Sequence, residues 1–199
     1  MKLSQLTQKI EMVGKAVFSI KDLRKLFPED AYLKTSVSRM LERGDLIQVV
    51  RGVYTLNQKD LDVEKIAPQL YYPSYISFES ALAKYGIINQ GRYGLTLATT
   101  RHSRQMTIAG TECIYSKLKP ALFFGFDLIH GVYLASPEKA VLDELYLISL
   151  GKRQADTSEW YTEDLDQNKL QEYLKPFNLS VHKMVSEMGL DKVVTKENN

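Results

Sequence analysis

Seven polar and basic side chains between positions 34 and 51 have the types and spacing to bind nucleic acid. The apolar residues Leu33, Val37, Met40 and Leu41 recur at i, i+4, i+7 and i+8, which predicts a helix with one buried face. The residues left outside are short, polar or cationic, and such side chains suit the phosphates and base edges of DNA. The candidate DNA-binding residues are Lys34, Thr35, Ser36, Ser38, Arg39, Arg43 and Arg51.

A hairpin with a basic tip is predicted directly after this helix. The β-branched runs 47–50 and 53–56 are typical of strands, and Gly52 between them can supply the positive φ that a two-residue turn needs. Arg51 would lie at the tip, where it buries nothing and can reach a phosphate or a minor groove. We interpret the pair as a recognition helix followed by a wing.

Two helices earlier in the chain would position the recognition helix and the wing. Apolar spacing predicts a helix over about 4–13 that stops at Gly14, and Ser19 is a plausible N-cap for a second helix that ends before Pro28. Three short helices followed by a two-stranded ribbon are typical of a winged helix-turn-helix. The alternative is a helical bundle whose hairpin contacts only protein.

The polar segment 57–62 predicts a boundary between a winged helix-turn-helix domain, residues 1–60, and a second domain, residues 61–199. In the second domain, Ser77 is expected to cap a helix over 78–85, and Ser136 a long central helix that ends near 150. Between them we expect an antiparallel sheet, followed by two helices near the C-terminus, so the fold class is α+β. The strand-like runs are 95–99, 106–109, 112–115, 121–126 and 132–134.

The net charge of +2 conceals a gradient along the chain. Residues 1–60 carry 11 Lys and Arg against 7 acidic residues, whereas residues 136–199 carry 8 against 12. A basic N-terminal segment favours a polyanionic partner. The start has no apolar core of a secretory signal, and the longest apolar stretch, 121–135, is too short to cross a bilayer, so we expect a cytoplasmic protein with no membrane partner.

The residue types that most often act in catalysis do not have the spacing of a known active site here. We therefore expect that the protein is not an enzyme and has no cofactor and no metal site. His102, His130 and His182 lack the spacing of a zinc site, and the chain has no phosphate-binding loop. The single cysteine, Cys113, is more typical of a small buried apolar residue than of a nucleophile. Glu138 and Asp143 are five residues apart, off the i, i+4 spacing that would pair them on one helix face.

A second basic group has two interpretations, a solvated loop and a further nucleic-acid surface, and the sequence leaves both open. It comprises Lys84, Arg92, Arg101 and Arg104, with His102 beside them.

Three stretches together resemble the AbiEi antitoxin family of bacterial type IV toxin–antitoxin systems, which act in abortive phage infection. They are 51–54 (RGVY), 75–86 (YISFESALAKYG) and 135–146 (ASPEKAVLDELY). The resemblance covers most of residues 5–150 and fades after Gly151. It implies a winged helix that binds double-stranded operator DNA and represses its own operon, and a C-terminal domain that opposes a nucleotidyltransferase-like toxin without a stable complex. The alternatives are a module that binds a toxin directly, or a nucleic-acid-processing enzyme.

Overall fold

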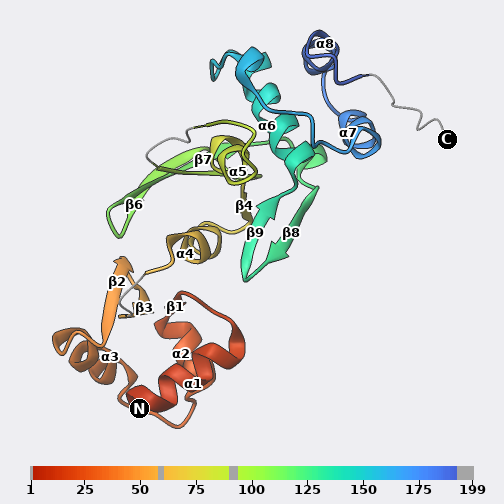
Figure 1. The fold of residues 1–199 in the computed structure, drawn as a ribbon. Coiled ribbons are helices and arrows are strands. Elements are labelled where there is room, and N and C mark those ends of the chain that lie inside the picture. The colour runs from red at the N-terminus through yellow and green to blue at the C-terminus, as the bar shows by residue number, and fades with distance from the viewer. Residues whose placement is uncertain (1, 58–60, 90–93, 192–199) are drawn as a thin grey trace. The chain divides into compact units, whose positions relative to one another are not determined.

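The protein is described by a computed structural model that covers residues 2–57, 61–89 and 94–191 (Figure 1). Its contacts divide the chain into two compact units, residues 1–72 with 107–111 and residues 73–106 with 112–199. Each unit has its own hydrophobic core, and the α+β class expected from the sequence is confirmed.

The first unit combines helices with a small antiparallel sheet in the strand order β1-β3-β2. The predicted first helix ends at Gly14, which adopts a left-handed φ of 65°. The second begins after Ser19, whose hydroxyl accepts from the amide of Asp22, as expected of an N-cap. The elements are α1 (Leu3–Val13), β1 (Phe18–Ser19), α2 (Ile20–Leu26), α3 (Leu33–Glu42), β2 (Leu46–Val50) and β3 (Val53–Leu56).

The core of this unit combines apolar side chains from α1, α2 and α3 with others from the three strands. In α3 the predicted face is confirmed for Leu33, Val37 and Met40, which are buried, while Leu41 is only partly buried. The burial of these side chains supplies most of the driving force that holds α3 in place.

A fourth helix, α4 (Val63–Leu70), also belongs to the first unit. The side-chain oxygen of Gln69 accepts from the amide of Ala16 at 2.9 Å. The boundary predicted at 57–62 therefore lies before a helix that packs with the first unit, which extends to Tyr72.

A six-stranded sheet has the order β6-β7-β5-β4-β9-β8, and the prediction of an antiparallel sheet is wrong because the sheet is mixed. β5 runs parallel to β7 from Gly94↔Glu112 to Thr99↔Lys117, and β4 runs parallel to β9. The alternation of apolar and polar residues shows which side chains of a strand face the core, but it does not identify the neighbouring strand or its direction. The strands are β4 (Ser74–Ile76), β5 (Gly94–Thr99), β6 (Arg104–Ile108), β7 (Thr111–Lys117), β8 (Phe126–Ile129) and β9 (Val132–Ala135).

The apolar run 121–126, predicted as a strand, is instead a short 3-10 helix (η1, Pro120–Leu122) and a turn. Gly125 in this turn has a φ of 70°, and β8 starts only at Phe126. The run is apolar because Phe123 and Phe126 pack against the ring of Tyr75, at centroid distances of 5.1 and 4.3 Å.

The predicted central helix is confirmed as α6 (Pro137–Ser149), in which every side chain from residue 138 to 147 is buried. It contacts α5 (Phe78–Lys84), α7 (Gln167–Leu174) and α8 (Leu179–Glu187), and Figure 1 shows it running through the second unit among these helices. A further 3-10 turn, η2, spans Thr157–Glu159. Across the described parts of the chain, no helix combines the length and the apolarity that crossing a membrane requires.

Candidate functional site

The residues proposed to bind DNA line the outer face of α3 and the tip of the β2–β3 hairpin. Six of them are exposed, and Ser36 is partly buried. Since the opposite face of α3 is held in the core, the side chains are presented on a rigid element. The exposed members are Lys34, Thr35, Ser38, Arg39, Arg43 and Arg51.

The cations on this surface are available for an external anion. Among residues 2–57, 61–89 and 94–191, no carboxylate forms an ion pair with Lys34, Arg39 or Arg51. Arg43 is partly engaged, since its Nε lies 3.9 Å from a carboxylate oxygen of Asp45 and donates to the carbonyl of Arg39. Unpaired cations on one surface create a positive potential that attracts phosphate.

The turn at the hairpin tip matches the prediction. Gly52 has a φ of 78°, a conformation that residues with a Cβ rarely adopt, and Arg51 beside it is exposed. The two strands pair from Leu46↔Leu56 to Val50↔Val53, with an irregularity between Gln48 and Val50.

The structure describes three of the four residues in the second basic group. Arg101 and Arg104 are exposed in the turn after β5 and at the start of β6, and Arg92 lies outside the described residues. Lys84 is exposed in the last turn of α5, a helix whose Ser80 contacts Gly94 at the opposite end of β5. Lys84 therefore lies toward the other end of the strand from the two arginines.

A buried charged network that the sequence analysis did not predict lies between β4, α5 and α6. Asp143 accepts hydrogen bonds of 2.8 Å from the hydroxyls of Tyr75 and Ser77 and forms an ion pair with Lys139. Both charged side chains have 0% exposure. Ser77 does occupy the start of α5, but its hydroxyl makes no capping bond, so the expected cap is replaced by this contact with α6.

Aromatic rings surround the ammonium group of Lys139. Its Nζ lies 5.7, 5.1 and 5.3 Å from the ring centroids of Tyr75, Phe124 and Phe177, within the range of cation–π attraction. Burial raises the pKa of Asp143 and lowers the pKa of Lys139. In the opposite direction, the positive charge of Lys139 lowers the pKa of Asp143, and the negative charge of Asp143 raises the pKa of Lys139. The pair has no access to solvent, so we assign it to the stability of the unit and not to chemistry on a substrate.

A second charged centre is formed around Arg153. Its guanidinium pairs with Glu79 of α5 and, at 2.7 Å, with Glu144 of α6, and it lies 4.5 Å from the ring centroid of Phe78. Phe78 adopts a φ of 57°, which is unusual for a residue with a bulky side chain, at the turn from β4 into α5. Burial lowers the pKa of Arg153 to about 10, so it remains a cation at neutral pH.

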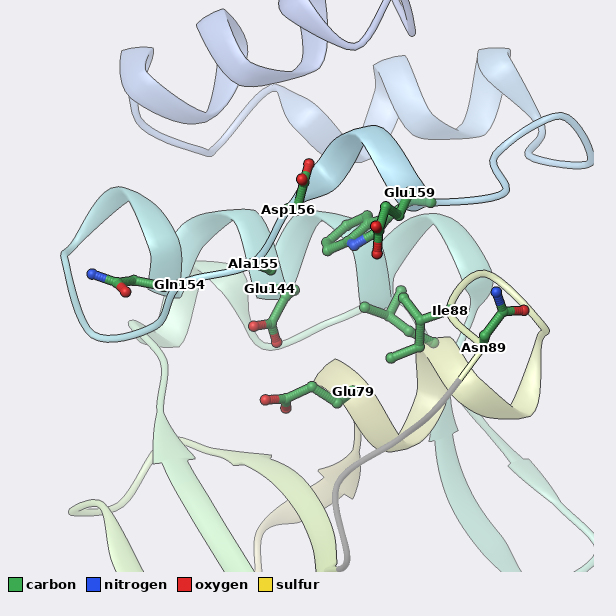
Figure 2. Close-up of a pocket in the computed structure, with 10 residues that line it drawn as sticks. Glu79, Ile88, Asn89, Glu144, Gln154, Ala155, Asp156 and Glu159 are labelled. Atoms are coloured by element: carbon green, nitrogen blue, oxygen red, sulfur yellow. The ribbon is translucent and has the colours of Figure 1, made fainter.

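A pocket of about 390 Å³ opens beside this centre (Figure 2). Figure 2 shows Glu79 and Glu144 approaching each other from α5 and α6, with Asp156 and Glu159 on the segment above them. Leu82, Ile88 and Trp160 supply apolar surface. The lining mixes carboxylates with apolar surface, and none of its described residues is a cation. Glu79 and Glu144 are paired with Arg153, so Asp156 and Glu159 are the carboxylates that would favour a positively charged group with an aliphatic or aromatic stem.

The described residues do not offer a metal centre. No group of His, Cys, Asp and Glu among residues 2–57, 61–89 and 94–191 is arranged to hold an ion. Cys113 is buried, and burial raises the pKa of its thiol to about 11, which opposes a nucleophilic role.

The stretches 75–86 and 135–146 meet in these two centres. Tyr75 and Ser77 of the first stretch bind Asp143 of the second directly, whereas Glu79 of the first and Glu144 of the second are joined through Arg153. The i, i+4 spacing of Lys139 and Asp143 was the one sequence signal that could have identified the pair. Arg153, which follows Gly151, carries no such signal. Neither a protein-family model nor a curated protein matches this sequence.

Proposed function

We propose that this protein is a DNA-binding repressor and antitoxin of the AbiEi kind, whose N-terminal residues act as a winged helix. The observation that carries the proposal is the exposed basic face of α3, with Lys34 and Arg39 unpaired among the described residues, next to a hairpin with Arg51 at its tip. A recognition helix with a basic wing binds a duplex through its major groove and the flanking backbone.

The element order in the first unit supports this reading. Three helices are followed by the β2–β3 hairpin, and β1 pairs with β3 to complete a small sheet. A repressor of its own operon acts where the DNA is, so we propose a cytoplasmic location.

For the second unit we propose the antitoxin role, which opposes a nucleotidyltransferase-like toxin without a stable complex. Its support is the resemblance of the stretches 75–86 and 135–146, together with the finding that side chains from both build the same two charged centres. Asp143 binds Tyr75 and Ser77 directly, and Arg153 bridges Glu79 and Glu144, so both centres need side chains from both stretches.

A titration of the full chain against duplexes that tile the region upstream of its own gene tests the repressor role. We expect one duplex to bind far more tightly than unrelated DNA of equal length, with an affinity that falls steeply as salt rises. The triple variant Lys34→Ala/Arg39→Ala/Arg51→Ala should lose this binding while it retains its circular dichroism spectrum. Equal, weak affinity for all duplexes at low salt would refute the operator claim.

The acidic pocket favours one other function, a module that binds a toxin directly through a basic side chain. Co-expression with the product of the neighbouring gene separates the two. A complex that survives gel filtration and is broken by Asp156→Lys/Glu159→Lys would support direct binding, whereas rescue from the toxin without co-elution supports the proposal above.

A further inference from the structure

Tyr32 is a large aromatic residue exposed at the start of α3. Its side chain is 75% exposed, although the next residue, Leu33, is buried in the core. The backbone amide of Tyr32 donates to a carboxylate oxygen of Asp30 at 2.9 Å, which fixes the chain where it enters the helix. The ring is thus presented to solvent from a well-defined backbone position.

Helical spacing places Tyr32 in line with the basic residues of α3. Tyr32 and Arg43 are the N-cap and C-cap residues of α3, and the carbonyl of Tyr32 accepts from the amide of Ser36 at 2.9 Å. Ser36, Arg39 and Arg43 follow Tyr32 at i+4, i+7 and i+11, spacings that assign the four positions to one stripe along the helix. Arg43 donates to the carbonyl of Arg39 within this stripe. Lys34 and Ser38 lie on the other flank of the exposed face, at positions that suit the phosphate backbone.

From this placement we propose that Tyr32 is a base-reading residue, whose ring contacts the 5-methyl group of a thymine in the major groove. The inference rests on the proposed DNA-binding function and makes it more specific. The N-terminal residues of a recognition helix are the ones that reach base edges, and the thymine methyl is the apolar mark of a T·A pair in that groove. A tyrosine ring, with few rotatable bonds, loses little conformational freedom on making such a contact.

Thymine-to-deoxyuridine scanning tests this contact, because the exchange removes one methyl group and leaves base pairing intact. The probe is the tightest duplex from the upstream region, with each thymine replaced in turn, and the proteins are wild type, Tyr32→Phe, Tyr32→Ala and the control Tyr161→Ala, which removes an exposed tyrosine from the second unit. For wild type, Tyr32→Phe and Tyr161→Ala, we expect one position to lower affinity about fourfold, the factor for one buried methyl group. Tyr32→Ala should bind the unmodified duplex more weakly and be insensitive to that exchange.

Tyr32→Ala that binds like wild type, or that keeps the same sensitivity to deoxyuridine, overturns the inference while leaving the DNA-binding function standing. Failure of wild type to prefer any duplex overturns the proposed function itself, and this inference with it. Unchanged thermal unfolding of Tyr32→Ala, expected for an exposed side chain, excludes loss of fold as the cause of weaker binding.

Discussion

The hydroxyl of Ser77 donates a hydrogen bond of 2.8 Å to Asp143, joining the first residue before α5 to the middle of α6. A serine at this position would ordinarily accept from an amide of its own helix. Here it stabilises a carboxylate that also balances the buried charge of Lys139, so the start of one helix and the interior of another depend on the same side chain.

Removing Asp143 should strongly destabilise the second unit. Asp143→Ala leaves the ammonium of Lys139 buried without a counter-ion, a situation that costs about 3–5 kcal/mol. The double variant Lys139→Met/Asp143→Leu removes both charges and should recover a large part of this loss. Urea unfolding followed by circular dichroism provides the comparison. If the double variant is no more stable than Asp143→Ala, the ion pair is not the source of the effect.

Arg153 should be required for stability in the same way, because it neutralises two carboxylates. Arg153→Met leaves Glu144, whose side chain is only 3% exposed, without this partner and should lower the free energy of unfolding by about 3 kcal/mol. Lys152→Met, which alters the exposed neighbour, is the matched control and should change it by less than about 0.5 kcal/mol. Equal effects of the two substitutions would contradict the role assigned to Arg153.

Arg39 and Arg51 should contribute differently to DNA binding. Arg39→Ala should weaken the free energy of binding to the preferred duplex by about 1–3 kcal/mol if the side chain contacts a base, and the free energy of binding to unrelated DNA much less. Arg51→Ala should weaken binding to the preferred duplex and to unrelated DNA alike. It should also reduce the slope of the logarithm of affinity against the logarithm of salt concentration by about 1, as expected for a phosphate contact. Fluorescence anisotropy over a range of salt measures both quantities. Lys183→Ala, an exposed cation in the second unit, should leave them unchanged.

Charge reversal of Arg101 and Arg104 distinguishes a second nucleic-acid surface from a solvated loop. Both side chains are exposed, so Arg101→Glu/Arg104→Glu should not disturb the core. A functional surface predicts loss of operator affinity or of rescue from the toxin. Retention of both activities would assign these residues to the solvated surface.

Asp22 should make the first unit sensitive to acid. Desolvation would raise the pKa of this carboxyl, but hydrogen bonds from Lys15 and Ser19 outweigh it and lower the pKa to about 2. Because the folded pKa is below the unfolded value, this stabilisation is complete above about pH 4 and is lost as pH falls toward 2. Thermal unfolding between pH 5 and pH 2 should therefore change less in Asp22→Asn than in wild type. Parallel pH dependence of the two proteins would contradict this assignment.

The sequence was most informative where structure is set locally. Gly14, Ser19 and Gly52 predict helix ends and a turn because a single residue's conformation or hydrogen bond decides each one. The parallel pairing of β4 with β9 depends on residues far apart in the chain, and no local pattern carries it. The sequence predicts that Ser77 caps its own helix, because its actual partner, Asp143, lies 66 positions away in the chain.

The pairing of Ile76 with Leu134 also has a consequence for the order of folding. The β1–β3 sheet and α1–α3 need only residues up to Leu56. In contrast, β4 and α5 gain β5 as a neighbour first, and their other neighbours, β9 and α6, come much later in the chain. During synthesis, α1–α3 and the β1–β3 sheet can therefore form before β9 and α6 have been made, while α4 and residues 107–111 join the first unit later. A chain truncated by premature termination would keep the basic surface of α3 and lack the centres around Asp143 and Arg153. If the proposed DNA-binding function holds, this fragment would compete with the intact protein for the same duplex.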